Sequence, residues 1–422
     1  MLKNGGISMY YLKTFLALFS VTTINAILGI ITTVKIANLL GPALYGEIVY
    51  GFALGGIFCV IVKFGTDKSL VRDYLQQPER TAEIFNAVIC FKVILSTLLI
   101  ITATLYAFLF DTVGISVAAL LIAIGVTLSA FQLQSLYDAK KCSTVHAKYF
   151  LIHRLFYFSV VWIFITFFPN IFTNIIPAAA TLIAVVLFVV LQFKGSSSIL
   201  NKTSIVFNSS DVKELILKNW LFAISSLLVV GVTSVSQLIV ASKLDMASLG
   251  LYGVCFQFVS MSSIVVKQVA RIGKRELVVA ITSKPDKTFL IISAYVVVLL
   301  LSVSPIAILC IFEADWLLSI LFNKEYAVGS KLLEIMGLFI ACNAVLIAIE
   351  QAAIARGIQV ANLVANATNG LLVCGISFLY IDQYGVNIVA WSLVIGALSA
   401  ALLTGLYLLF FKRPTTLDLK EV

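Results

Sequence analysis

Residues 51–80 read GFALGGIFCVIVKFGTDKSLVRDYLQQPER, and this stretch decides the class of fold. Its first twelve residues carry no formal charge, whereas the next eighteen carry seven. Such an abrupt change is typical of a membrane-spanning helix that ends in an aqueous loop. The whole chain agrees, because 61% of its 422 residues are hydrophobic, 12% are charged and the mean hydropathy is +1.07. The sequence therefore predicts an integral membrane protein.

Apolar runs long enough to cross a bilayer, about 20 residues each, recur along the entire chain. These runs predict helices, since a helix satisfies its backbone hydrogen bonds internally. The N-terminal run lacks a suitable small-residue cleavage site, so we expect a retained first helix rather than a signal peptide. The expected fold is all-α and polytopic, with about twelve transmembrane helices at residues 12–38, 44–64, 84–110, 114–137, 148–168, 171–193, 218–242, 247–267, 288–312, 331–355, 358–381 and 385–411.

Lysine and arginine predict the orientation, because they are enriched in cytoplasmic loops. With the N-terminus inside, most of the 29 Lys and Arg residues fall on the cytoplasmic side. The outer side then receives mainly Lys35, Lys243, Lys324 and Lys331. An even number of spans places both termini in the cytoplasm.

The charged segment 63–80 becomes a cytoplasmic loop in this topology. Four apolar residues in it share one helical face, opposite Lys68, Arg72 and Gln76, and Pro78 follows. We expect a short amphipathic helix on the inner leaflet, with an apolar face of Leu70, Val71, Tyr74 and Leu75.

The longest polar stretch, residues 194–219, divides the chain nearly in half. On either side of it lies a weak repeat: KIANLLGPALYGEIVYGF, residues 35–52, resembles SKLDMASLGLYGVCFQF, residues 242–258. We expect two six-helix lobes, residues 1–200 and 201–422, related by an axis along the membrane normal.

Enzyme motifs are missing from the sequence. It contains no G-x4-G-K-[ST] phosphate loop, no GxSxG elbow and no HExxH pair. The cysteines form no CxxC pair, and His146 and His153 have no nearby carboxylate or thiolate in sequence, so we expect no metal site and no cofactor. The net charge of +9 is dispersed in short loops, which argues against a nucleic-acid partner. Transport, rather than an enzyme activity, is the function that the sequence favours.

Polar cargo requires ionisable or amide side chains inside the membrane, where a charge is costly unless it is hydrated or paired. Lys92 lies about eight residues inside the third span, roughly 12 Å deep. Either it faces a cavity or its ammonium snorkels to the interface. Arg154, in the fifth span, lies less deep, and it too either faces a cavity or snorkels to the interface.

Three further charged residues are candidates. Lys35 and Glu47 flank the first outer turn, where they either pair with each other or stand separately in interfacial water. Glu350 lies near the inner end of the tenth span, and a carboxylate there is a candidate carrier of a coupling proton.

Amides supply a second signal. Asn362, Asn366 and Asn369 fall at i, i+4 and i+7 and therefore share one helical face. That face meets either a cavity or another helix, to which it would hydrogen bond. Asn25 in the first span is a similar candidate.

The stretches LGPALYGEIVYGFAL, residues 40–54, and FGTDKSLVRDY, residues 64–74, resemble those of the Wzx-type O-antigen and polysaccharide flippases. These belong to the multidrug/oligosaccharidyl-lipid/polysaccharide exporter superfamily. The resemblance covers essentially the whole chain and implies a MATE-like fold in the bacterial inner membrane. The implied cargo is an undecaprenyl-pyrophosphate-linked oligosaccharide, carried across by alternating access during O-antigen and lipopolysaccharide biosynthesis. Implied partners are this glycan, membrane lipids, a polysaccharide polymerase and a chain-length regulator.

Our own assignment within that mechanism gives Lys92, Arg154 and Lys35 the anionic head group, because a pyrophosphate needs cationic ligands. Asn25, Asn362, Asn366 and Asn369 are further candidate substrate ligands, and Glu350 and Glu47 are candidates for ion coupling.

Two other functions remain open. An ion-coupled multidrug or small-solute exporter of the same superfamily would share the architecture. A multidrug exporter of cationic cargo would require acidic cavity residues, and the intramembrane Lys92 and Arg154 argue against it. They do not argue against a small-solute transporter, which therefore stays open. A membrane glycan polymerase or ligase would need a sizeable outer loop with catalytic Arg or His, and the sequence has none.

Overall fold

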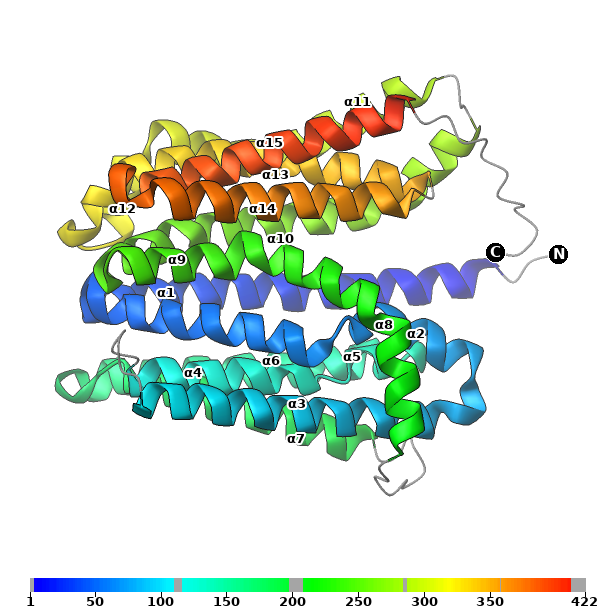
Figure 1. Cartoon of the computed structure of the whole chain (residues 1–422), viewed down its shortest axis with the longest axis horizontal. Helices are drawn as coiled ribbons and strands as arrows, with labels where there is room; N and C mark the ends of the chain where they lie inside the picture. The colour runs from blue at the N-terminus through cyan, green and yellow to red at the C-terminus, as the bar shows by residue number, and fades with distance from the viewer. Residues whose placement is uncertain (1–3, 110–115, 197–207, 284–286, 357, 411–422) are drawn as a thin grey trace. The chain divides into compact units, whose positions relative to one another are not determined.

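The computed structural model describes residues 4–109, 116–196, 208–283, 287–356 and 358–410. This part of the chain is almost entirely helical and contains no β-strand, which confirms the all-α class. It forms two compact units, Met1–Gly250 and Leu251–Val422 (Figure 1). The predicted division into lobes 1–200 and 201–422 stays a prediction, as do the cytoplasmic termini. Residues 1–3 and 411–422 lie outside the described residues.

The first unit is built around α1, which packs against α3, α4, α6, α8 and α9. Its helices are α1 (Asn4–Lys63), α2 (Thr66–Gln76), α3 (Thr81–Leu109), α4 (Val117–Leu128), α5 (Gln134–Ala139), α6 (Ser143–Phe167), α7 (Ile175–Ser196), α8 (Ser209–Val230), α9 (Ser236–Lys243) and the start of α10 (Met246–Ser283). Short 3₁₀ turns at η1 (Pro78–Arg80), η2 (Ser129–Phe131) and η3 (Pro169–Ile171) follow α2, α4 and α6, and a π-helical turn, η4 (Gly231–Val235), joins α8 to α9.

The second unit contains the rest of α10 and five further helices. α13 packs against α11, α14 and α15, and α14 packs against α15. Their bounds are α11 (Thr288–Phe312), α12 (Ala314–Leu321), α13 (Ser330–Ala355), α14 (Gln359–Tyr384) and α15 (Asn387–Phe410), with η6 (Lys324–Gly329) before α13.

The predicted spans correspond to these helices. Eleven helical segments of the described residues are long and apolar enough to cross a membrane. The first segment belongs to α1, which continues through both of the first two predicted spans. The boundary between these spans is a kink at Gly41, where φ is 74° and ψ is 172°. Glycine adopts this left-handed φ at little cost, and Pro42 follows it. The chain is therefore a multi-pass membrane protein.

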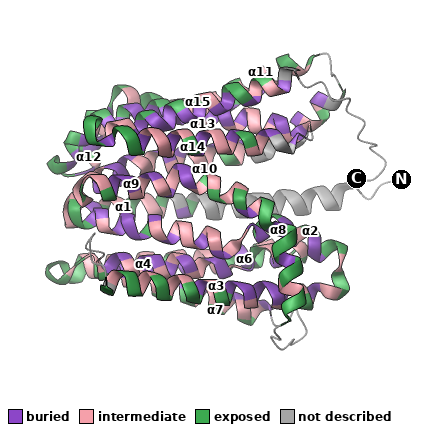
Figure 2. Cartoon of the chain, in the orientation of Figure 1, coloured by how far each residue is buried: buried purple, intermediate pink, exposed green. Residues whose placement is uncertain are grey.

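Exposed residues follow the outer faces of the helices (Figure 2), and many of them are large and apolar. Leu98 is 59% exposed and Leu371 is 68% exposed. Side chains of this kind on long apolar helices meet lipid tails in a bilayer, whereas in water they would aggregate. The exposed faces are therefore consistent with the membrane location.

The predicted amphipathic helix is α2. Leu70 and Tyr74 are buried as expected, but Leu75 is 61% exposed. The buried face instead includes Thr66, Ser69 and Asp73, because α2 packs against α5 and α8 as well as α3. Leu70 and Tyr74 belong to an apolar cluster to which all four of these helices contribute.

Two glycines permit close backbone contact at the other end of the first unit. A Cβ added at Gly46 would overlap the Met246 carbonyl, and one at Gly250 would overlap the Pro42 carbonyl. Residues 42–46 and 246–250, which lie within the two segments of the sequence repeat, are therefore packed against each other.

Candidate functional site

Three of the predicted substrate ligands lie on two helices that pack together, α1 and α6. Asn25 is 8% exposed, and neither polar atom of its amide has a hydrogen-bond partner among the described residues. An unsatisfied buried amide costs about 1–3 kcal/mol. Such a group is typically completed by water or a ligand.

Arg154 lies near the middle of α6. Its Nε is buried without a hydrogen-bond partner in the described part of the chain, and its guanidinium lies 5.6 Å from the centre of the Phe150 ring. Two turns further on, Trp162 buries its Nε1 in the same unsatisfied state. Lys35 of α1 places its Nζ 6.0 Å from the Trp162 ring centre. The α1–α6 pair thus carries two cations, of which Lys35 is exposed, and two buried donors without a partner among the described residues, Nε of Arg154 and Nε1 of Trp162.

Lys92 has a different environment. It is 2% exposed, and its Nζ donates to the carbonyl of Ala130 at 2.7 Å. Ala130 lies in the 3₁₀ turn that follows α4, so the ammonium occupies the negative end of a helix dipole. Lys92 is therefore packed inside the first unit in this conformation, and its role as a substrate ligand stays a prediction.

Glu47 and Lys35 do not form an ion pair with each other among the described residues. Glu47 accepts a hydrogen bond from Nδ2 of Asn174, which precedes α7. The sequence did not predict this partner, because Asn174 is distant along the chain.

The remaining predicted residues lie in the second unit. Glu350 of α13 is half-buried, as are Asn362 and Asn366 of α14. Asn369 is 7% exposed and packs against α15, since a Cβ at Gly396 would overlap its Oδ1. Its Oδ1 has no hydrogen-bond partner among the described residues, so the choice between a cavity and a hydrogen bond to another helix stays open for Asn369.

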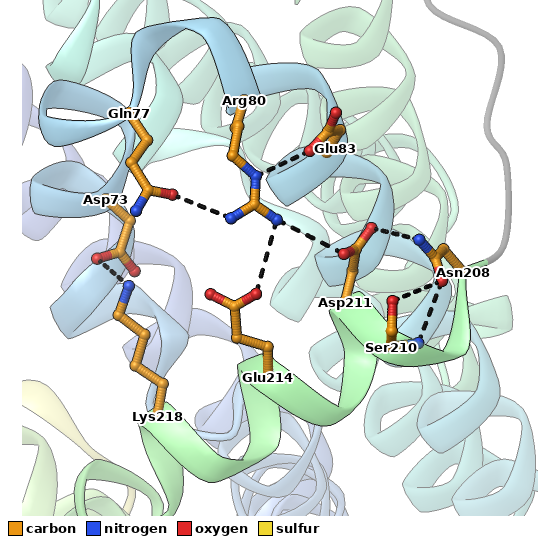
Figure 3. Close-up of polar contacts among 9 residues, drawn as sticks. All are labelled: Asp73, Gln77, Arg80, Glu83, Asn208, Ser210, Asp211, Glu214 and Lys218. Carbon is orange, nitrogen blue, oxygen red and sulfur yellow. Dashed lines mark hydrogen bonds and ion pairs between the residues drawn. The ribbon is translucent and has the colours of Figure 1, made fainter.

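A second polar site joins α2, η1 and α3 to α8 (Figure 3). We call it the α2–α8 polar cluster, and its members are Ser69, Asp73, Gln77, Arg80, Glu83, Asp211, Glu214, Lys218 and Asn219. The sequence predicts that residues 63–80, which contain Ser69, Asp73, Gln77 and Arg80, form a cytoplasmic loop, but it indicates no function for the members of the cluster.

Arg80 is at one end of this cluster. Its Nε donates to Glu83 at 2.9 Å, and its Nη2 lies 3.6 Å from both Asp211 and Glu214 on α8. Asn208 caps α8 by accepting from the backbone N–H of Ser210 at 3.1 Å. The cap fixes the helix end that presents the two carboxylates.

Asp73 is at the other end of the cluster, with a side chain that is 6% exposed. Lys218 places its Nζ 2.9 Å from the carboxylate, and Arg72 lies 3.4 Å from it. Beside this pair, Ser69 donates to Oδ1 of Asn219 at 2.6 Å, and Asn219 donates to the Leu215 carbonyl. The buried carboxylate is thus paired across two helices, as a charge in this position requires.

A cavity of about 40 Å³ lies within the cluster, lined by Asp73, Arg80, Asp211 and Lys218 among others. Its size accommodates water but no solute. The cluster is therefore a contact between helices rather than a binding pocket. A signal for it exists in the sequence: Asp211, Glu214 and Lys218 fall at i, i+3 and i+7, which places them on one helical face.

The described residues contain no group of three or more His, Cys, Asp or Glu side chains that could hold a metal ion. His146 and His153 pack against Phe188 of α7, with ring centroids 5.8 Å and 5.2 Å from it. The two histidines thus contribute to the contact between α6 and α7.

Several solved structures have a similar fold. The lipid II flippase MurJ in an inward closed conformation is similar with a TM-score of 0.75 at 16% identity, covering 94% of this chain and 88% of that chain. An inward-facing multidrug resistance MATE family transporter of the MOP superfamily is similar with a TM-score of 0.68 at 13% identity, covering 93% and 97%. An outward-facing structure of such a transporter has a TM-score of 0.55 at 13% identity, covering 93% and 92%. The chain shares the fold of these solved structures.

The family model for polysaccharide biosynthesis proteins matches residues 11–272, which is more than half of the chain. The chain belongs to this family of polysaccharide biosynthesis proteins. No curated protein matches it. The resemblance to polysaccharide flippases seen in the sequence is confirmed, and the family and fold are those of a membrane flippase or transporter.

Proposed function

We propose that this protein is a flippase that moves an undecaprenyl-pyrophosphate-linked oligosaccharide, such as an O-antigen repeat unit, across the bacterial inner membrane. The polysaccharide biosynthesis family and the flippase-like fold support this function. The physical task fits a transporter rather than an enzyme. A pyrophosphate with a hydrophilic glycan cannot cross about 30 Å of hydrocarbon unaided, whereas its polyprenyl tail remains in the lipid.

The observation that carries the proposal is the half-buried Arg154, whose Nε is buried without a hydrogen-bond partner, on the helix that packs against α1. It has no acidic partner among the described residues, and Asn25 on α1 is also unsatisfied. A guanidinium without a carboxylate suits a phosphate, with which it makes charge-assisted hydrogen bonds. It does not suit a cationic drug.

The other predicted ligands take part in the proposal as follows. Lys35, beside Trp162, is a second cation for the pyrophosphate. Lys92 acts only in a conformation in which its bond to Ala130 is broken. Asn362, Asn366 and Asn369 bind sugar hydroxyls, and Glu350 carries a coupling proton, with Glu47 as a second candidate for ion coupling.

The α2–α8 polar cluster is proposed as the cytoplasmic gate. α2, α3 and α8 all belong to the first compact unit, so the ion pairs of Arg80 and Lys218 hold α8 against α2 and α3 within that unit. Opening of the gate requires a movement of α8 that breaks these contacts during alternating access.

Complementation tests the proposal. A strain that lacks the gene should lose surface polysaccharide and accumulate the lipid-linked repeat unit, and the wild-type gene should restore both. Arg154→Leu should fail to restore them at normal expression, while its thermal stability in detergent should equal or exceed that of the wild type, because the change removes an unsatisfied buried group.

Lys213→Gln is the matched control, because Lys213 is an exposed cation of α8, and it should restore surface polysaccharide. Unchanged surface polysaccharide in the deletion strain would refute the function. Full activity of Arg154→Leu would refute the site and leave the function standing.

A further inference from the structure

The second unit contains an apolar groove that neither the family nor the proposed transport site explains. It has a volume of about 450 Å³ and lies where the start of α11 meets the ends of α13 and α15. Its lining is mostly aliphatic and aromatic: Phe289, Ile292, Val296, Val297, Ile349 and Leu408. Volumes of this size are typical of sites for small molecules.

One side of the groove borders the face of the unit that meets lipid. Phe289 is 69% exposed and Val297 is 51% exposed, and both line the groove on α11. The neighbouring Leu290 and Leu301 are similarly exposed. A lipid chain can therefore enter the groove sideways from the bilayer without crossing water.

Charge is concentrated at one end of the groove. Arg356, the residue that ends α13, lines it together with the hydroxyl-bearing Thr288 and Ser293. The residues that line the groove include no acidic side chain. The first turn of α11 also contains no acidic residue, so the positive end of its dipole adds to the charge of Arg356.

The guanidinium of Arg356 has capacity for a ligand. One of its nitrogens, Nη1, donates to the Leu408 carbonyl at 2.6 Å, and this is its one hydrogen bond within the described residues. A guanidinium has five N–H donors in a fixed plane. The bond to Leu408 holds the group in place, and the remaining donors fit a phosphate.

We propose that this groove binds an anionic membrane phospholipid, with an acyl chain along α11 and the phosphodiester on Arg356. Among the described residues that line the groove Arg356 is the one cation, which matches the single charge of a phosphodiester. A pyrophosphate, with more negative charge, would need a further cationic ligand. The site lies at the end of the helices that the topology places on the cytoplasmic side, where α15 ends. The bound lipid would hold α11 against α13 and α15.

Native mass spectrometry of the purified full chain tests the assignment, with phosphatidylglycerol and phosphatidylcholine as probes. Wild type should retain phosphatidylglycerol in preference to phosphatidylcholine. Arg356→Gln should lower the preference about tenfold, as expected for one charge-assisted hydrogen bond. Phosphatidylcholine retention should not change, because glutamine still donates to Leu408 and the apolar lining remains.

Two further variants separate charge from shape. Gly405 lines the groove, and a Cβ there would have only Ile349 nearby, at 4.0 Å. Gly405→Phe should therefore fill the groove and reduce retention of both lipids. Lys213→Gln removes an exposed charge from the first unit and should leave the preference at the wild-type value.

The proposal fails if Arg356→Gln keeps the wild-type preference, or if the wild type does not discriminate between the two lipids. It also fails if undecaprenyl diphosphate displaces phosphatidylglycerol at equal concentration, because the groove would then belong to the transport substrate. None of these results depends on the complementation experiment, so this site and the proposed function are tested separately.

Discussion

Asp73 illustrates how a charged residue of a loop becomes part of a helix contact. Its carboxylate is almost completely buried, and a buried charge needs a partner of opposite charge. Lys218 supplies this partner from a helix about 145 residues further along the chain. Arg72, the next-nearest cation, is half exposed. The stability of α2 against α8 therefore depends on the pairing of Asp73 with Lys218.

We expect Lys218→Met to destabilise the protein by about 1–2 kcal/mol, because Asp73 is left with a weaker partner. The loss is smaller than for a fully buried pair, since the side chain of Lys218 is 36% exposed. Thermal unfolding in detergent measures it. Lys213→Met on the same helix is the control and should be neutral, and adding Asp73→Asn to Lys218→Met should recover part of the loss. Equal effects at Lys213 and Lys218 would contradict the pairing.

Arg154 and Lys92 show the limit of sequence reasoning for single residues. Depth within an apolar span made both residues candidates to face a cavity, with snorkelling as the alternative. Only the structure distinguishes them, because the carbonyl that satisfies Lys92 belongs to Ala130, 38 residues away. Nothing in the local sequence of Arg154 indicates that its Nε has no such partner.

Among the elements, α1 and α10 approach each other closely at Gly46 and Gly250. We expect Gly46→Ala to destabilise the protein by about 1–3 kcal/mol, since the added methyl group overlaps backbone that cannot move aside. Gly29→Ala is a matched control on the same helix, where a Cβ meets nothing within 4 Å. That change should stabilise the protein by about 0.5–1 kcal/mol through helix propensity. Thermal unfolding of both variants measures these stability changes. An unchanged stability of Gly46→Ala would mean that α1 and α10 are less closely packed than in this structure.

The contact between α2 and α8 can be tested as a gate. Ser69 and Asn219 are hydrogen bonded across it, so cysteines at both positions in a cysteine-free background should form a disulfide on oxidation. If the contact must open in each cycle, the disulfide should abolish transport and a reductant should restore it. Surface polysaccharide or transport in reconstituted vesicles provides the measurement, with each single cysteine as control. Transport that continues in the cross-linked protein would exclude a gating role.

The π-helical turn between α8 and α9 gives this gate a structural basis. Residues 231–235 interrupt the α-helical hydrogen bonding directly after the helix that contains Lys218 and Asn219. Interruptions of this kind are frequent at functional sites. A Cβ at Gly56 of α1 would contact Ser234 in the turn, so α1 packs closely against it.

For the whole molecule, the distribution of Lys and Arg predicts which side faces the cytoplasm. Single cysteines at two strongly exposed positions test the orientation in a cysteine-free background. Val328, 81% exposed before α13, should react with an impermeant thiol reagent from outside intact cells. Leu75, 61% exposed on α2, should react only after the membrane is permeabilised. The reverse pattern would invert the topology and remove the cytoplasmic gate from the proposal.

The sequence by itself determined the membrane class, the helical fold and nearly all span positions, as for α11, where the predicted and observed bounds coincide at 288–312. This follows because lipid requires long apolar helices, and that requirement acts on each segment separately. The break at Gly41 was likewise visible as Gly-Pro between two apolar runs.

Only the tertiary structure decided which polar groups meet. The pairing of Arg80 and Asp73 with α8, the bond between Glu47 and Asn174, and the unsatisfied state of Arg154 all depend on helices that are distant in sequence. Helical periodicity assigns a residue to a face, but the neighbour of that face is set by packing among all the helices. Residue type and depth therefore indicate candidate site residues, whereas their partners follow only from the packing of the helices.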